Sequence, residues 1–550
     1  MGWVLLFVFF IMPVLRLIIQ SARDDNGFTL DYFLKIFSNE STWIVLRNTI
    51  ILVFSSTIIA TIIGITFAWI IAYTDIRFKK IISIFIVLPI IIPSYITTLS
   101  WVHFYGKNGF LIKIAEFVKL PFEGFNLYSM SGMILVMAIS TYPFVYLFTV
   151  NNLRKIPPEH EFASRIAGAN KVNTFFKVNV PMAIPGISSG IFIAFLSSLD
   201  NFGIPAFLGI PANKTVLTTL IYQKVIGYSS GNFNEAAVLS VVLGMIALLG
   251  HRLQNKATQK SIYGETQRVY TTPRINLKHK KYIIEIVLSL FFILTTLLPL
   301  LAIILMPMFK AYGLEFKLEN LSFDNYVYVF SNQGTKNALY NSLRLSVVTS
   351  LICLLIGTIF SYFRTRKGTT KLKVVESIIT LPYSLPGTVY GLALIITWLE
   401  PLPGWNPGIY GTLIIICLAY TTRFMVLQIR NSISAFQQVD PVFEDASRIC
   451  GSNSIGKWKK ILLPLTIPSI LNGTWLIFNN SLTELTMSTL LYSSKTRTIG
   501  VTVQNLQQAG QSLKAAAFSS VIVILMFISY MIIKVIVLVI RKGNKYDYNT

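Results

Sequence analysis

The amino-acid sequence predicts an all-α protein that crosses a lipid bilayer about 12 times, with its helices arranged as two repeats of six. Composition, the spacing of long apolar runs and an internal repeat all predict this fold class. The 550-residue chain is 53% hydrophobic and 13% charged, with a mean hydropathy of +0.63, whereas soluble domains carry roughly 25% charged residues. A hydrocarbon core of about 30 Å requires about 20 apolar residues in a helix, and such runs recur along the chain.

The apolar runs define the predicted membrane spans. We place them near 3–20, 45–72, 82–104, 130–152, 183–202, 235–251, 282–306, 342–363, 375–399, 411–431, 467–489 and 515–540. The first run is longer than the apolar region of a typical signal peptide and has no clear cleavage site, so we interpret it as a retained helix.

Basic residues gather in alternate loops, which predicts the orientation. The basic segments are 77–80, 154–177, 252–281, 364–373, 423–460 and 541–545, whereas 203–233 and 401–410 are poorer in Lys and Arg. Short loops rich in Lys and Arg face the cytoplasm, so we expect both termini there. The net charge of +24 is explained by these loops beside the lipid bilayer, and nucleic-acid binding is not favoured.

The chain is written twice, with an even number of helices in each copy. Adding 293 maps Asp31 to Asp324, Asn48 to Asn341, Gly64 to Gly357, Leu88-Pro89 to Leu381-Pro382 and Pro93 to Pro386; an offset of 283 applies later. Two halves of six helices enter the membrane in the same orientation, as parallel repeats do. We predict a first half at 1–252, a basic cytoplasmic linker at 253–281 and a second half at 282–550.

Two predicted cytoplasmic loops, at about 157–185 and 440–468, carry one pattern of residues. The members are Glu161, Ala163, Gly168 and Pro181 in the first loop, and Glu444, Ala446, Gly451 and Pro464 in the second. A proline followed by acidic residues suits the first turn of a short helix. Glycine suits the left-handed position that ends it. Small residues in the helix permit close approach by a partner, so we interpret both loops as docking elements.

This pattern resembles the EAA loop of ABC importer permeases: Glu-x-Ala, Gly five residues after the Ala, and Val-Pro or Leu-Pro about a dozen residues further on. Phe162 and Asp445 depart from the usual Ala at the second position. The resemblance implies a type I ABC importer permease fold in a bacterial plasma membrane, with each loop seated in a cleft of an ATPase. It also implies two copies of a cytoplasmic ATP-binding subunit and an extracytoplasmic solute-binding protein. The alternative is a basic loop lying on lipid headgroups, which two matched copies disfavour.

No catalytic, nucleotide or metal site is predicted on this chain. The segment 451–457 fits a P-loop until Trp458, where Ser or Thr should bind magnesium, and no strand is expected before it. The three cysteines lack CxxC spacing and the four histidines form no metal-binding pair. We therefore expect no cofactor here, with ATP and magnesium bound by the partner ATPase.

Asp200 and Glu484 stand near the outer ends of two predicted spans, at matching places within one residue. A carboxylate deep in lipid costs about 2.5–3.5 kcal/mol, so both should face the bundle interior or water. Two hypotheses remain open: structural carboxylates, or parts of an external gate or solute path.

The segments from Leu199 to Gly209 and around Glu484 look like those of iron(III)-type fused permeases. The resemblance therefore implies import of iron(III), with thiamine, phosphonate and polyamine as alternatives. An ion-coupled secondary transporter also uses six-plus-six repeats but would not need the paired loops, and a membrane-embedded enzyme would need a catalytic cluster.

Overall fold

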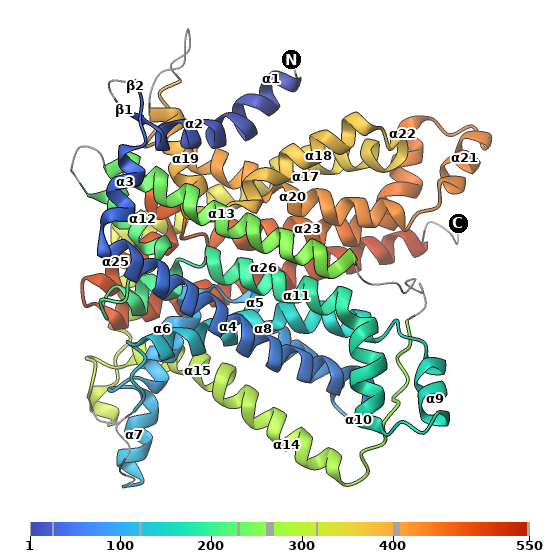
Figure 1. Ribbon diagram of the computed structural model, residues 1–550, viewed down its shortest axis with the longest axis horizontal. Helices are drawn as coiled ribbons and strands as arrows, with labels where there is room; N and C mark the ends of the chain where they lie inside the picture. The colour runs from blue at the N-terminus through green and yellow to red at the C-terminus, as the bar shows by residue number, and fades with distance from the viewer. Residues whose placement is uncertain are drawn as a thin grey trace. The chain divides into compact units, whose positions relative to one another are not determined.

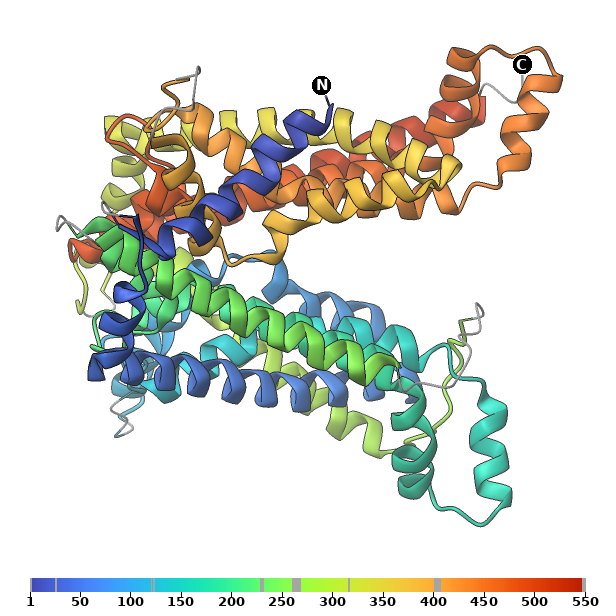
Figure 2. The same ribbon diagram turned by 45° about the horizontal axis from the view of Figure 1, so that its top comes forward.

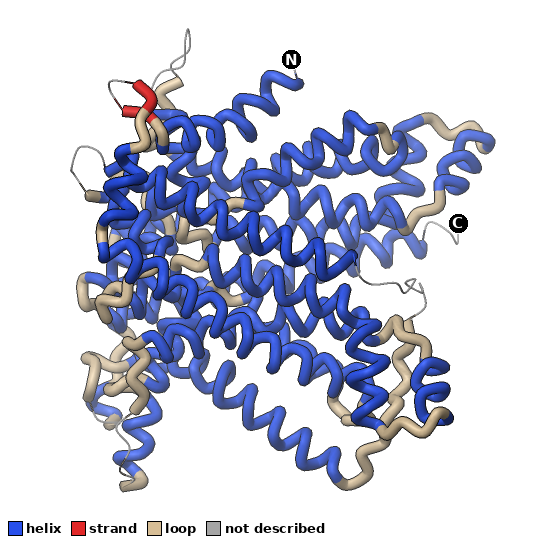
Figure 3. The backbone as a smooth tube through the Cα atoms, in the orientation of Figure 1, coloured by secondary structure: helices blue, strands red, loops and turns tan. Residues whose placement is uncertain are grey.

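A computed structural model describes residues 2–24, 27–119, 121, 124–227, 232–259, 269–314, 317–399 and 407–546. Residues 260–268 of the predicted linker and 400–406 of the weakly basic loop lie outside the described residues. Helices dominate the described chain (Figure 3), and its strands β1 (Arg23–Asp24) and β2 (Gly27–Phe28) pair antiparallel. The all-α fold class is confirmed.

Ten described helical runs are long and apolar enough to cross a membrane. They are Gly2–Ser21, Glu40–Tyr73 (α4), Met130–Leu153 (α8), Lys171–Asp200, Phe233–Gly250, Lys280–Met308, Gln333–Lys367 (α17), Leu413–Gln437 (α20), Ser454–Leu482 and Ser512–Ile540. Two further spans are pairs of shorter helices, which gives up to 12. The predicted count is therefore confirmed, although two spans differ in shape from the expectation.

The spans predicted near 82–104 and 375–399 are each broken into two helices. Helix α5 (Lys79–Ile91) meets the helical run Ser94–Glu116 at 106°, and α18 (Thr370–Ser384) meets α19 (Gly387–Leu399) at 105°. Ile92 and Leu385, which precede Pro93 and Pro386, have extended backbones with ψ of 128° and 144°. A residue before proline avoids the helical region because the proline ring clashes with it, so the second proline of each pair ends the helix.

The remaining elements repeat at the offsets read from the sequence. Helix α9 (Pro158–Ile166) matches α21 (Pro441–Ile449), and α10 (Lys171–Thr174) matches α22 (Ser454–Lys457). The π-helical segments η2 (Phe175–Asn179) and η7 (Trp458–Leu462) match likewise, before α11 (Val180–Asp200) and α23 (Leu463–Leu482). The other elements are α3 (Asp31–Ser38), α6 (Ser94–Tyr105), α7 (Phe110–Phe117), η3 (Pro205–Gly209), α12 (Leu217–Ile226), α13 (Asn232–Gln259), η6 (Leu318–Asn320), α16 (Asp324–Ser331), α24 (Ser488–Leu491), α25 (Ile499–Gln508) and α26 (Ser512–Tyr546).

The chain forms two compact units, and each contains the first helix of the other sequence half. One unit comprises Met1–Tyr32, Val225–Val238 and Tyr326–Thr550, and the other comprises Phe33–Lys224 and Leu239–Asn325. In the first unit, α1 (Gly2–Leu6), η1 (Phe7–Ile11) and α2 (Met12–Ser21) run beside α18 and α19 (Figure 1). Arg16 Nη1 donates to Thr397 O at 3.2 Å, and Phe9 stacks on Trp398 at 5.9 Å between ring centroids. Arg16 thus caps the end of α19, which is a structural role.

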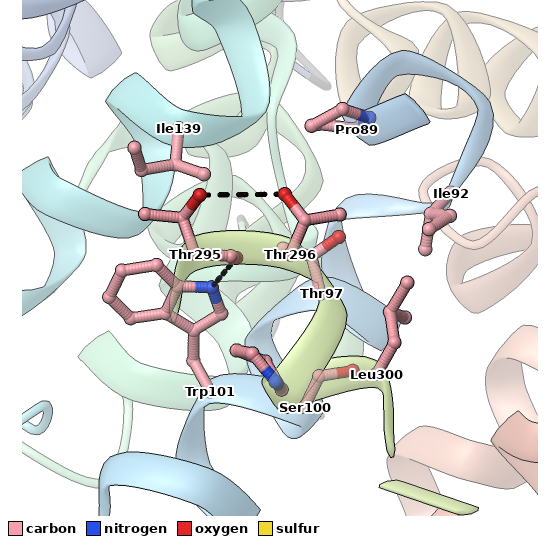
Figure 4. A pocket seen from close by; sticks show the side chains of 10 residues that line it. Pro89, Ile92, Thr97, Ser100, Trp101, Ile139, Thr295, Thr296 and Leu300 are labelled. Atoms are coloured by element: carbon pink, nitrogen blue, oxygen red, sulfur yellow. Dashed lines mark hydrogen bonds between the residues drawn. The ribbon is translucent and has the colours of Figure 1, made fainter. Parts of the chain in front are cut away.

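In the second unit the exchanged helix runs from α14 (Lys280–Phe292) through η4 (Ile293–Leu297) and α15 (Leu298–Leu305) to η5 (Met306–Met308). Trp101 Nε1 donates to Thr295 O at 3.2 Å, across a pocket of about 10 Å³ lined by α5, α6, α8, η4 and α15 (Figure 4). This pocket has room for roughly one water molecule, so it is a packing defect beside the helix break.

Two boundaries differ from the sequence prediction. The basic segment expected to begin at Arg423 begins later, because α20 continues to Gln437 and leaves Arg423 inside the helix with 7% exposure. The span expected to reach residue 489 ends at Leu482. After Leu482 the chain turns into the short helix α24, and the carboxylate of Glu484 accepts hydrogen bonds from residues at the start of that helix.

Candidate functional site in the two short-helix loops

Helices α9 and α21 each stand on a loop beyond the ends of the long helices of their own unit (Figure 2). Each begins with a proline at its first position, Pro158 or Pro441, and each has a glutamate in its first turn. Proline lacks the N–H that a helix start leaves unpaired, and acidic side chains favour the positive end of the helix dipole. The two short helices expected from the sequence are therefore present, with matching starts.

Both helices end on a left-handed glycine, as predicted. Gly168 has φ +86° and Gly451 has φ +77°. Ala169 N donates to Ser164 O at 3.0 Å, and Ser452 N donates to Ser447 O at the same distance. These bonds satisfy carbonyls that the helix end would leave unpaired. A Cβ at either glycine would meet no atom within 4 Å, so backbone conformation is what requires glycine.

The chain then returns towards the membrane as one continuous helix rather than through a break at proline. Asn170 and Asn453 cap the second short helix by accepting from Asn173 N at 2.8 Å and Gly456 N at 2.7 Å. Pro181 and Pro464 each lie at the second residue of the following α-helix, after a π-helical turn. The extra residue in each π-turn accommodates the proline without ending the helix.

Glu161 and Glu444 point back into their own units and are each 5% exposed. Glu161 forms an ion pair with Arg274 and accepts from Asn179 Nδ2 at 3.2 Å. Glu444 forms an ion pair with Arg366, and its other oxygen accepts from Lys457 Nζ at 2.8 Å and from Tyr362 at 2.9 Å. The lysine of the rejected P-loop match is thus engaged inside the loop. Glu444 thus anchors its loop to α17 through Arg366, and Glu161 anchors its loop to Arg274 of the segment that precedes α14.

The electrostatics of the second anchor favour a charged carboxylate. Burial opposes ionisation of Glu444, but hydrogen bonds from Lys457, Tyr362 and Arg366 outweigh it and hold the pKa of this carboxyl below its usual range. A carboxylate with several donors commonly shows such a lowered pKa. Glu444 is therefore ionised at neutral pH.

The exposed residues of the loops include small and apolar side chains beside charged ones, and some of them were not identified by the sequence motif. Ala163, Gly168, Ala446 and Gly451 are exposed, as expected for a close-approach surface. Ile166 and Ile449, which match at the 283 offset, are 88% and 87% exposed. Other exposed apolar side chains beside them are Phe162, Val172 and Phe176 in the first loop and Val442, Phe443 and Ile455 in the second. Exposed apolar patches of this kind are typical of protein or membrane interaction sites.

Glu484 caps a turn of its own chain. Its carboxylate accepts from Met487 N at 2.8 Å, Ser488 N at 2.9 Å and Ser488 Oγ at 2.7 Å. At the 283 offset its counterpart is Asn201, whose Oδ1 accepts from Ile204 N at 3.0 Å. Asp200 is the last residue of α11 and is half-buried. The sequence comparison paired Glu484 with Asp200, whereas the hydrogen bonds pair it with Asn201.

A helical membrane protein built of two repeats, each presenting a short helix on a loop, has the features of a membrane transport component. The chain belongs to the family described as binding-protein-dependent transport system inner membrane component, whose sequence profile matches residues 60–260 and 353–543. It is therefore an inner-membrane permease component of an ABC importer system, with the family domain present twice.

Relatives of the chain are also permeases. The ferric transport system permease protein FbpB of Actinobacillus pleuropneumoniae is 24% identical over 536 residues, which cover 95% of this chain and 75% of the relative. The putative ferric transport system permease protein FbpB 1 of Haemophilus influenzae is 25% identical, covering 90% and 77%. The sulfate transport system permease protein CysT of Escherichia coli is 26% identical, covering 40% and 78%. These matches confirm the resemblance to iron(III)-type fused permeases.

Among solved structures, a crystal structure of a bacterial alginate ABC transporter in complex with its alginate pentasaccharide-bound periplasmic protein aligns with 48% of this chain and 94% of that chain. The sequence identity is 15% and the TM-score is 0.39.

Proposed function

We propose that the chain couples ATP hydrolysis on a separate protein to solute import, and that two copies of a cytoplasmic ATP-binding subunit dock on α9 and α21. The observation that carries this proposal is the matched pair of exposed isoleucines, Ile166 and Ile449, on loops whose glutamates are anchored by buried ion pairs. A rigid loop with an apolar tip can transmit a displacement of the docked partner to the membrane helices that are connected to the loop. ATP and magnesium are bound by the partner, and the chain itself is a transport subunit.

The proposed contact residues differ in role. The surface that the partner approaches closely consists of Ala163, Gly168, Ala446 and Gly451. The loops are fixed in place by Glu161 and Glu444. The helices that receive the motion, α11 and α23, have Pro181 and Pro464 as their second residues. The matched loops favour two symmetric docking sites over a basic loop lying on lipid.

Docking is tested by placing a charge on the apolar tip. Ile166→Asp with Ile449→Asp should abolish co-purification of the ATPase with the permease, because an aspartate cannot be buried in an apolar cleft without a partner. Leu318→Asp is the matched control, since Leu318 is 87% exposed in η6. Retention of the ATPase by the double variant at wild-type levels would exclude these loops as the docking sites.

The proposed orientation puts both loops, the linker and both termini in the cytoplasm. Its support is the excess of Lys and Arg in the loops on that side. A cysteine at exposed Lys280, in a chain without native cysteines, should resist a membrane-impermeant thiol reagent in intact cells and react after permeabilisation. Labelling in intact cells would reverse the orientation.

The solute we propose is iron(III), delivered by an extracytoplasmic solute-binding protein. The two ferric permeases align with 90% or more of this chain, whereas the sulfate permease aligns with 40% of it. Both halves of this chain therefore align with permeases that are named for ferric iron. Asp200 is the proposed carboxylate of the external gate or path, and the structure of the Glu484 turn favours a structural role for that residue.

A further inference from the structure

The described end of the linker follows a fixed path beneath the first loop. Tyr270 N donates to Arg154 O at 2.7 Å. Arg274 N and Ile275 N both donate to Tyr73 O, at 2.8 Å and 2.9 Å. Leu277 N donates to Asp75 Oδ1 at 2.8 Å. These bonds tie the segment 270–277 to the ends of α4 and α8.

The side chain of Arg274 reaches into the loop from this path. It is 7% exposed, lies over the Tyr73 ring at 4.6 Å, and donates both to the carboxylate of Glu161 and to the carbonyl of Ile156. Ile156 lies two residues before α9, and Glu161 lies in its first turn. One guanidinium therefore holds the start of the helix at two points.

The second loop is held at the same two points by an arginine from a different place. Arg366 donates to the carboxylate of Glu444 and, through Nη2, to Val439 O at 3.0 Å. Val439 and Glu444 are Ile156 and Glu161 plus 283. Arg366, however, lies in α17 and matches Tyr73 of α4 at the offset of 293. The first repeat has an aromatic ring where the second has the anchoring arginine.

We infer that Arg274 is the positioning residue of the first loop, the one that carries α9. The second loop is positioned by Arg366 of α17. The matching residue of α4 is Tyr73, so the linker supplies the arginine instead. The linker thus positions the first loop as well as connecting the two halves of the chain. Glu444 also contacts Lys457, whereas the matching residue in the first repeat is Thr174, which bonds to Ser164. Among the described residues, Arg274 is the cation that contacts Glu161. The position of the first loop therefore depends on Arg274 more than the position of the second loop depends on Arg366.

The inference predicts which loop each arginine controls. Spin labels at Ile166→Cys and Ile449→Cys, placed singly in a full-length chain whose three native cysteines are replaced, report the mobility of α9 and α21. Arg274→Ala should increase mobility at 166 and leave 449 unchanged. Arg366→Ala should do the reverse, with a smaller change because Lys457 remains. Lys280→Ala, which removes an exposed charge elsewhere in the linker, should change neither label.

A rescue variant separates positioning from general damage to the fold. Tyr73→Arg combined with Arg274→Ala places an arginine in α4 at the position of Arg366, and it should return the 166 label to its original mobility. An unchanged 166 label in Arg274→Ala would overturn the inference, and so would failure of the rescue in a chain that inserts normally.

The consequence for transport rests on the proposed function, but the two ideas fail differently. The spin-label measurement uses the permease alone, so it tests the anchor without the ATPase. If Arg274→Ala frees α9 while ATPase co-purification and uptake stay at wild-type levels, the anchor stands and docking on α9 is wrong.

Discussion

Glu484 and Asn201 cap equivalent turns in the two repeats, each accepting from the backbone N–H three residues further on, at 2.8 Å and 3.0 Å. The residue types differ, but both side chains cap the turn that follows the helix. A carboxylate accepts more hydrogen bonds than an amide oxygen does, and Glu484 also takes Ser488 N and Oγ. The turn after α23 is thus held more tightly than its counterpart.

Removing the Glu484 side chain should therefore destabilise the permease. Glu484→Ala loses three hydrogen bonds, each worth about 1 kcal/mol, and should lower the unfolding temperature and the abundance of the protein in membranes. Glu484→Gln keeps an acceptor oxygen and should lose less. Asn201→Ala, which removes the matching cap, is the control and should be milder. Normal stability with lost uptake in Glu484→Gln would instead assign Glu484 to the solute path.

Replacing the glycines that end α9 and α21 should strain the loops. A β-branched residue at φ +86° or +77° costs about 1–2 kcal/mol, so Gly168→Val and Gly451→Val should each weaken ATPase co-purification, and the double variant should lose transport. Gly244→Val is a suitable control, because a Cβ there also meets no atom within 4 Å and the backbone is ordinary helix. Equal loss in the control would show that strain at the loops is not the cause.

The charged state of Glu444 makes the second loop sensitive to acid. Its folded-state pKa lies below the usual range, so its stabilising contribution is complete above the unfolded value of about 4.3 and is lost as the pH falls through the folded value. Glu444→Gln should therefore unfold at a lower temperature than wild type at pH 7, with the difference shrinking towards pH 3. A difference that is constant with pH would contradict the ion pair.

Much of this architecture was predictable because apolar runs, basic loops and a repeat determine membrane topology. The left-handed glycines followed from helix-end chemistry, since Gly168 and Gly451 come directly after short helices. Two features of the fold were not predictable. The breaks at Pro93 and Pro386 depend on the extended residues before them, which a proline pattern alone does not distinguish from a kink. Arg423 resembled a loop charge because burial is set by tertiary packing.

The contact of Arg274 with Glu161 joins residues 113 positions apart, and no local pattern indicates it. A mismatch in the repeat, Tyr73 against Arg366, was the available signal. It becomes informative only when the second arginine is seen bound to the equivalent carbonyl.

The solute prediction concerns Asp200 at the end of α11. If this carboxylate meets the released cation, Asp200→Asn should reduce uptake of radiolabelled iron(III) about tenfold, which corresponds to about 1.4 kcal/mol, while permease abundance and ATPase co-purification stay normal. Carboxylate oxygens suit a hard cation, and an amide is a poorer ligand. Glu285→Gln is the matched control, because Glu285 lies in α14 and accepts from Arg77 N of its own unit. Uptake should be measured with the ATPase and the binding protein present and divided by permease abundance. Loss of folded Asp200→Asn protein would assign Asp200 a structural role, and uptake of labelled thiamine in place of iron by the wild-type system would replace the proposed solute while leaving the importer class unchanged.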